Sequence, residues 1–230
     1  MSIVFPWGSA VNMAAIIVGS LIGMGLGDRL PERARSIVFQ GLGLCIVVMG
    51  VQMAMESKAP LLLIGSVVLG GLFGELAALE EIFTRGGDAL KRRLGSKNPV
   101  FTEGFVTTTV LFCIGSLAIL GPFEEALAGR RTILYTKTIL DFFASIAFAS
   151  RFGAGVLCSG FSVFLYQGAF TLFASALQPI LTPARLAELI AVGGILVMAI
   201  SINMLRMAAI RTSNLLPALA FAAIFGMIFL

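Results

Sequence analysis

The chain has no histidine among its 230 residues, and only 12% of them are charged. The lack of histidine excludes a histidine-ligated metal site, a Ser-His-Asp triad and a proton relay through imidazole. Soluble domains carry about 25% charged residues, whereas this chain is 58% hydrophobic with a mean hydropathy of +1.01. The composition therefore predicts an integral membrane protein.

Basic residues and cysteines are also few, and their positions exclude further classes of protein. The net charge of +4 comes from residues between apolar runs, with no basic and aromatic patch, so we expect no nucleic-acid partner. Cys45, Cys113 and Cys158 lie in apolar segments without CxxC spacing, which predicts buried thiols. No Lys or Arg precedes Arg29, so residues 1–27 lack a secretory n-region and are expected to stay as a transmembrane helix.

Apolar runs of about 17 to 25 residues predict an all-α polytopic membrane bundle that forms a single integral domain over 1–230. The expected crossings are 10–27, 36–55, 60–77, 104–121, 133–150, 153–177, 186–205 and 214–230. Lys137 and Asp141 interrupt the fifth, which leaves a re-entrant segment or two half-helices as alternatives. With the N-terminus outside, eleven Lys and Arg fall on the cytoplasmic side and five outside, so both termini are predicted outside.

Segment 76–94 has apolar residues at helical spacing and a basic end, which predicts an amphipathic helix at the cytoplasmic interface. Its basic end would face anionic lipid, and the alternative is a docking site for a cytosolic partner.

A short internal similarity suggests an inverted repeat of the kind found in transporters. Its residues are Pro31, Arg33, Gly41 and Leu44, repeated with the same spacing as Pro183, Arg185, Gly193 and Leu196. The repeat units would be 8–77 and 153–230, joined by 78–152.

Asp141 is the most informative residue, because an ionisable group at membrane depth is costly and marks function by default. Lys137 precedes it by four residues on the same helical face. A closed ion pair that only rigidifies the helix is therefore the structural alternative.

Four amides also lie inside apolar spans, and each needs a partner in hydrocarbon, either another helix or a bound solute. They are Asn12, Gln52, Gln167 and Asn203. Gly115 and Ser116 suggest a broken helix whose freed backbone groups face a solute. Thr108 is a further candidate, although hydroxyls in a membrane usually bond back to their own helix.

Glycines recur every fourth residue at Gly19, Gly23 and Gly27, and Gly70 pairs with Gly74. This spacing indicates close helix packing, within the chain or between subunits, and makes a homo-oligomer, specifically a homodimer, an expectation.

A set of short motifs, in order over nearly the whole chain, resembles the domain of unknown function 554 family of YqgA-like bacterial inner-membrane proteins. These motifs include Gly70-Gly-Leu-Phe-Gly-Glu75, Leu111-Phe-Cys-Ile-Gly-Ser116, Leu134-Tyr-Thr-Lys-Thr-Ile-Leu-Asp141 and Tyr166-Gln-Gly168. The resemblance implies a multi-pass protein of the inner membrane and an effect on biofilm formation. It implies no substrate and no catalytic residue.

The residues predict a secondary transporter of a small polar or anionic solute, such as an amino acid or organic acid, coupled to H⁺ or Na⁺. The alternatives are an ion or solute channel and a non-transporting membrane scaffold that affects biofilm formation. An enzyme is not expected, because no nucleophile has an evident base, and neither a cofactor nor a metal site is predicted.

Overall fold

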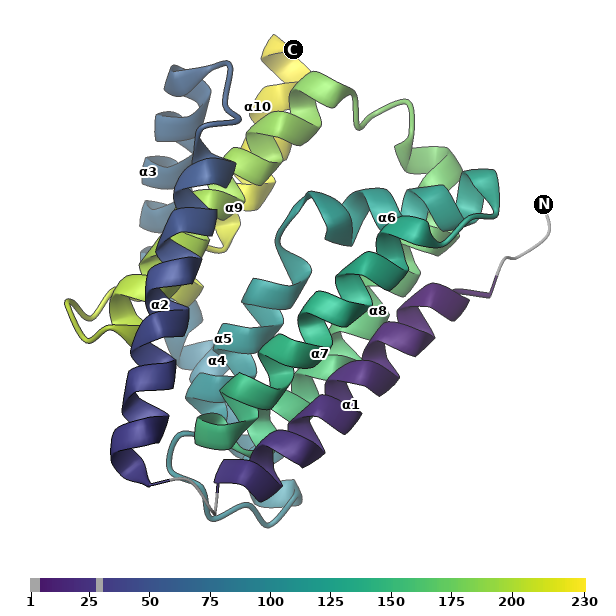
Figure 1. The fold of residues 1–230 in the computed structure, drawn as a ribbon. Coiled ribbons are helices and arrows are strands. Elements are labelled where there is room, and N and C mark those ends of the chain that lie inside the picture. The colour runs from purple at the N-terminus through teal and green to yellow at the C-terminus, as the bar shows by residue number, and fades with distance from the viewer. Residues whose placement is uncertain (1–4, 28–30) are drawn as a thin grey trace. The chain divides into compact units, whose positions relative to one another are not determined.

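The computed structural model describes residues 5–27 and 31–230, and all elements in these ranges are helices (Figure 1). Arg29, which entered the orientation count, lies outside the described residues, as do the side chains of Glu32, Arg35 and Ser116. The elements are α1 (Trp7–Gly27), α2 (Glu32–Ala54), α3 (Pro60–Leu76), α4 (Leu79–Arg93), α5 (Phe101–Cys113), α6 (Ser116–Ala128), α7 (Thr132–Phe152), α8 (Ala154–Leu177), α9 (Pro183–Met204), η1 (Thr212–Leu215) and α10 (Pro217–Phe229). The predicted all-α class is confirmed.

Six of the described helical segments are long and apolar enough to cross a membrane, and eight spans result if each of two bent helix pairs is counted as one. The interrupted fifth crossing is the continuous helix α7, of 21 residues. The predicted crossing 104–121 corresponds to the pair α5 and α6, which together are long and apolar enough to span but are bent by 55° at a break. Gly115 lies in that break with φ 140° and ψ 155°, a conformation that side chains with a Cβ rarely adopt.

Contacts divide the chain into two compact units. Unit 1 comprises Met1–Val38 and Gly87–Pro179, and unit 2 comprises Phe39–Gly86 and Ile180–Leu230. The long helices α1, α7 and α8 and the broken pair α5–α6 therefore belong to unit 1. Unit 2 contains α3, α9, η1 and α10. The inverted repeat suggested by the sequence stays a prediction.

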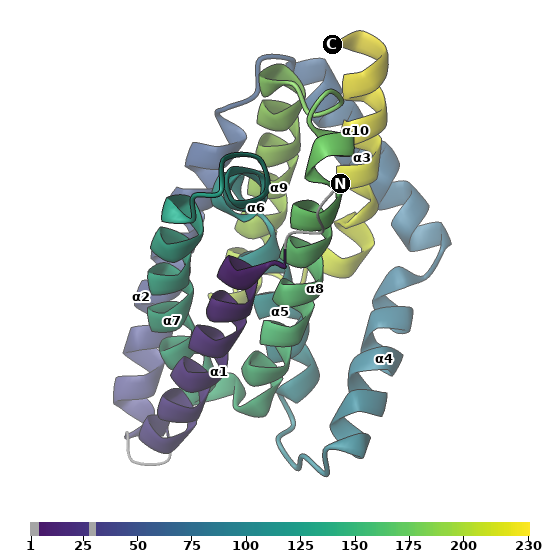
Figure 2. The ribbon, with the colours of Figure 1, turned by 90° about the vertical axis from the view of Figure 1, so that its right-hand side faces the viewer.

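In unit 1, α1 lies along α7 and α8, as both views show (Figures 1 and 2). The glycines of α1 make this approach possible. A Cβ atom on Gly19 would overlap Ser145, one on Gly23 would overlap the carbonyl oxygen of Ile146, and one on Gly27 would overlap that of Ser150. The glycine stripe therefore packs against a helix of the same chain.

In unit 2, α3 packs against α10 and η1. Gly70 meets the backbone of Ala218, and Gly74 meets that of Asn214. Both glycine faces are thus used within the chain, and the homodimer stays a prediction without their support. Cys113 and Cys158 are buried, but the prediction of a buried thiol is wrong for Cys45, which is exposed on α2.

Replacing Gly23 by Ala should lower the free energy of unfolding by about 1–3 kcal/mol, because the added methyl group forces α1 away from Ile146. The matched control is Gly25→Ala on the same helix, where an added Cβ meets no atom within 4 Å. This control should be neutral or stabilising by up to about 1 kcal/mol. Thermal unfolding of both purified variants in one detergent checks the difference, and equal unfolding temperatures would contradict the packing.

Candidate functional site

Four polar side chains from three helices of unit 1 meet in its interior, and we call them the polar cluster. They are Asn12 of α1, Lys137 and Asp141 of α7, and Gln167 of α8. Asn12, Asp141 and Gln167 lie in apolar stretches of their helices, whereas Lys137 lies between Thr136 and Thr138. Lys137 and Asp141 are 5% and 6% exposed, and both amides are fully buried.

Asp141 is the centre of the polar cluster. Its Oδ2 atom accepts hydrogen bonds from Lys137 Nζ, one helical turn earlier, and from Asn12 Nδ2 at 2.9 Å. Asn12 Nδ2 also donates to Gln167 Oε1 at 3.3 Å. The ion pair with Lys137 that the sequence offered as an alternative is formed, and Asp141 also contacts one of the four membrane amides, Asn12.

The carboxylate fixes how both amides are oriented. An ionised carboxylate only accepts hydrogen bonds, so the Asn12 atom facing it must be the NH₂ group. The Gln167 atom that faces the same NH₂ group must then be its oxygen. This leaves Asn12 Oδ1, an acceptor, and Gln167 Nε2, a donor, buried without a hydrogen-bond partner among the residues that the structure describes.

Such unpartnered groups are costly, and so is the ion pair. Leaving a buried donor or acceptor unpaired costs about 1–3 kcal/mol. Burying two charges also carries a desolvation penalty that their attraction repays only with good geometry and further hydrogen bonds. Apolar side chains would stabilise this interior better, so the cluster is an expensive arrangement that stability alone does not explain.

The break between α5 and α6 adjoins the polar cluster. Lys137 Nζ lies 5.8 Å from the ring centroid of Phe112, near the end of α5, within range of a cation–π interaction. Helix α6 begins just after the break, and its N-cap Gly115 provides no side-chain hydrogen bond. The first N–H groups of a helix lack intrahelical partners and carry partial positive charge. The helix break suggested at Gly115 and Ser116 is present in the structure.

The other predicted site residues are arranged differently. Thr108 Oγ1 donates to the carbonyl oxygen of Gly104 at 2.7 Å, so its hydroxyl bonds back to its own helix. Asn203, in unit 2, bonds both the N–H and the C=O of Ile210 and so closes the loop after α9. Gln52, also in unit 2, is exposed. The contacts of Thr108 and Asn203 favour structural roles, and the exposed Gln52 shows no sign of belonging to a site.

Two buried carboxylates were missed by the sequence reasoning. In unit 1, Glu125 Oε1 accepts from the backbone N–H of Gly8 at 2.9 Å and from Arg131 Nε at 2.5 Å. The hydrogen bond to Glu125 raises the pKa of Arg131 above its usual value, so this guanidinium stays charged. In unit 2, Glu188 accepts from the backbone N–H groups of Lys58 and Ala59 at the start of α3.

A signal for Glu125 was available, since the pair Glu124–Glu125 precedes the pair Arg130–Arg131 by six residues across the end of a helix. Both pairs fall between the predicted crossings 104–121 and 133–150, where charges predict a loop. Glu188 follows Pro183 by five residues within an apolar run, and its contact with residues 57–59 is a long-range one that no local pattern reports.

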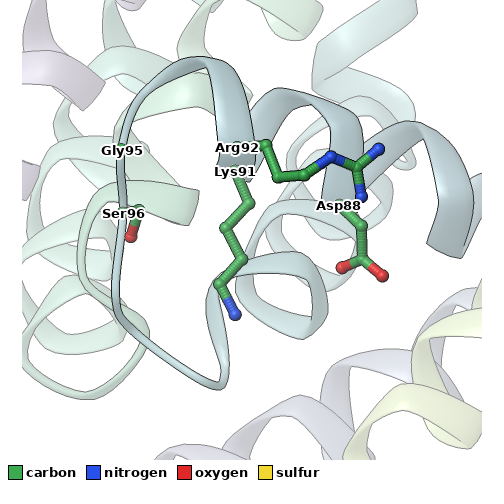
Figure 3. A pocket seen from close by; sticks show the side chains of 5 residues that line it. All are labelled: Asp88, Lys91, Arg92, Gly95 and Ser96. Carbon is green, nitrogen blue, oxygen red and sulfur yellow. The ribbon is translucent and has the colours of Figure 1, made fainter.

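A surface pocket of about 440 Å³ lies at the C-terminal end of α4, lined by Asp88, Lys91, Arg92, Gly95 and Ser96 (Figure 3). Lys91 and Arg92 extend in different directions from the last turns of the helix. Asp88 accepts a hydrogen bond from Thr102 Oγ1 at 2.8 Å, which attaches this half of α4 to α5. The pocket is open and basic, unlike the buried polar cluster.

Comparisons with known proteins identify relatives over nearly the full length. The chain is 36% identical over 217 residues to "Uncharacterized membrane protein YdfK" of Bacillus subtilis (strain 168), covering 93% of this chain and 92% of the relative. It is 30% identical over 220 residues to "Uncharacterized protein YqgA" of Escherichia coli (strain K12), covering 94% of each. No solved structure shows significant similarity to the chain.

The family described as "Protein of unknown function (DUF554)" matches residues 7–227. This range contains all four residues of the polar cluster and the break at Gly115. The chain therefore belongs to the DUF554 family.

Proposed function

We propose that this membrane protein is a secondary transporter that moves a small polar or anionic solute together with H⁺ or Na⁺. The observation that carries the proposal is the polar cluster: a buried ion pair, in membrane-spanning helices, beside two amides that each keep an unused hydrogen-bonding group. Ionisable groups at membrane depth mark ion and substrate pathways.

The unused groups define the chemistry of the solute. Gln167 Nε2 is a donor suited to a carboxylate oxygen, and Asn12 Oδ1 is an acceptor suited to an ammonium or hydroxyl group. Both groups belong to side chains that contact each other, so a compact solute would reach them together. An amino acid or a small organic acid carries such groups within a few ångströms.

Asp141 provides the coupling. When H⁺ or Na⁺ binds the carboxylate, the attraction that holds Lys137 is weakened, and the ammonium group becomes available to an anionic solute. When the cation leaves, Lys137 returns to Asp141 and the solute loses its partner. The ion pair thus makes binding of the two species interdependent, as thermodynamic linkage requires of coupled transport.

The helix break supports the same assignment. The start of α6 follows Phe112, the neighbour of Lys137, by four residues. Its first backbone N–H groups have no side-chain cap, and broken helices in transporters present such groups to anionic solutes. Gly115 permits the break because its backbone is in the positive-φ region. Residues Gly115 and Ser116 therefore belong to the proposed site through their backbone.

A carrier fits the cluster better than a channel does. A continuous water-filled pore would hydrate Lys137 and Asp141, yet both are almost fully buried and paired with each other. The closed pair represents an occluded arrangement, which alternating access requires and a pore does not.

The proposal places the protein in the bacterial inner membrane with both termini outside. The named relatives come from bacteria, and one is called a membrane protein. The basic pocket of α4, with Lys91 and Arg92, would then face the anionic headgroups of the cytoplasmic leaflet.

Replacing Asp141 by Asn should abolish gradient-driven uptake into proteoliposomes, because the amide keeps the size of the side chain and its contact with Asn12 but loses the charge that couples the two species. Uptake is measured for a panel of radiolabelled amino acids and organic acids under an imposed proton or Na⁺ gradient. Empty vesicles define the background to which uptake should fall.

Ser145→Ala is the matched control for this variant. Ser145 lies one turn after Asp141 on α7, is fully buried, and bonds only the carbonyl oxygen of Phe142 among the contacts described. Its loss should leave uptake near the wild-type rate. Undiminished, still gradient-dependent uptake by Asp141→Asn would rule out the coupling role.

Replacing Lys137 by Met should lower the free energy of unfolding by about 3–5 kcal/mol, because it leaves the Asp141 carboxylate buried without its counter-ion. Adding Asp141→Asn should restore most of this loss, since the double variant has no buried charge. Thermal unfolding in lipid nanodiscs measures both. A double variant no more stable than Lys137→Met would show that the two charges do not depend on each other.

A further inference from the structure

Glu125 is a second buried carboxylate of unit 1, and its two oxygens differ in their contacts. Its residue is 1% exposed, and Oε1 takes both the Gly8 N–H and Arg131. The second oxygen, Oε2, has no hydrogen-bond partner among the described residues. This oxygen is an unused acceptor, and buried polar atoms are as a rule satisfied by protein or by ordered water.

Helix α1 connects Glu125 to the polar cluster. Glu125 bonds the backbone of Gly8, and Asp141 bonds the side chain of Asn12, four residues later. Four residues of α-helix span roughly 6 Å along the axis. The two carboxylates therefore bond the same helix at points only one turn apart.

The side chains within that turn have unused polar atoms. Ser9 is fully buried and lies in sequence between Gly8 and Asn12, and its hydroxyl has no hydrogen-bond partner among the described residues. Asn12 Oδ1 and Gln167 Nε2, on two side chains that contact each other, have none either. Together with Glu125, four residues thus each have one buried polar atom without a partner in the described part of the chain, whereas buried polar groups are as a rule satisfied by protein or ordered water. One turn beyond Asn12, the same helix buries the apolar side chain of Ile16.

We propose that these atoms line a hydrated track for a small monovalent cation that leads from Glu125 past Ser9 to Asp141. Arg131 closes its mouth, because its side chain is 34% exposed and bonds the buried carboxylate. Ile16 ends the track on the far side of Asn12. The role of the track as the route of the coupling ion rests on the proposed transport function. The existence of the track does not depend on transport.

The test uses Ag⁺ as a thiol-reactive cation of suitable size. Ser9→Cys and, as the matched control, Ile16→Cys are made in the full-length chain after Cys45, Cys113 and Cys158 have been replaced by Ala. Both positions are fully buried on α1, one in the track and one beyond it. Silver adducts are counted over time by intact-mass spectrometry in a chloride-free nitrate buffer.

The Ser9→Cys thiol should react about tenfold faster than the Ile16→Cys thiol or more, because only the first lies among hydrated polar atoms. Adding Arg131→Gln should accelerate the reaction at Ser9→Cys several-fold, whereas Arg130→Gln, an exposed neighbour whose side chain is 74% exposed, should not. Slow reaction of Ile16→Cys in the Arg131→Gln background shows that the bundle has not loosened.

Equal rates at the two positions would overturn the track, and an unchanged rate with Arg131→Gln would overturn the gate. These outcomes are separate from the fate of the transport proposal. Fast labelling at Ser9→Cys together with no uptake of any solute would reject transport and keep the track, whereas uptake without labelling would do the reverse.

Discussion

The buried pair Lys137–Asp141 is the interaction on which the rest of unit 1 depends. Two charges in an apolar interior are tolerated only when their remaining hydrogen-bonding groups are also paired. Asn12, on α1, donates one such hydrogen bond to Asp141. That contact requires α1 to lie close against α7. The glycines of α1 supply the close approach, because a Cβ at Gly19 or Gly23 would collide with α7. The close packing of α1 against α7 and the hydrogen bonding of the buried ion pair therefore depend on each other.

The cost of this arrangement supports a functional origin. Each unused polar atom in the cluster lowers stability, and a fully apolar interior would avoid all of them. Asn12, which holds one of these atoms, lies on α1 one turn after Gly8, which bonds the buried carboxylate of Glu125. A protein that only needed to pack its helices would have no reason to bury two carboxylates and an ammonium group in unit 1.

Much of the fold follows from the sequence, since apolar runs bounded by Pro, Gly and charge predict helices within a few residues, as for α8 (Ala154–Leu177). The pair Gly115-Ser116 suggests the break within the crossing 104–121, but hydropathy alone does not report the 55° bend. The hydrogen-bond partner of a buried polar side chain could not be predicted from the neighbouring sequence. Asn12 and Asn203 look alike in sequence, yet one joins a buried carboxylate and the other closes a loop. Glu125 was missed because its burial depends on α1, 117 residues away.

The central claim is that Asp141 exchanges its partner when the coupling cation binds. Infrared difference spectroscopy of the protein in lipid, while the bathing solution is switched in pH or between K⁺ and Na⁺, reports this directly. The account predicts a change in a carboxylate or carboxylic-acid band under one of these switches, absent from Asp141→Asn and shifted in Lys137→Met. A difference spectrum that is identical in the wild type and Asp141→Asn under both switches would contradict it.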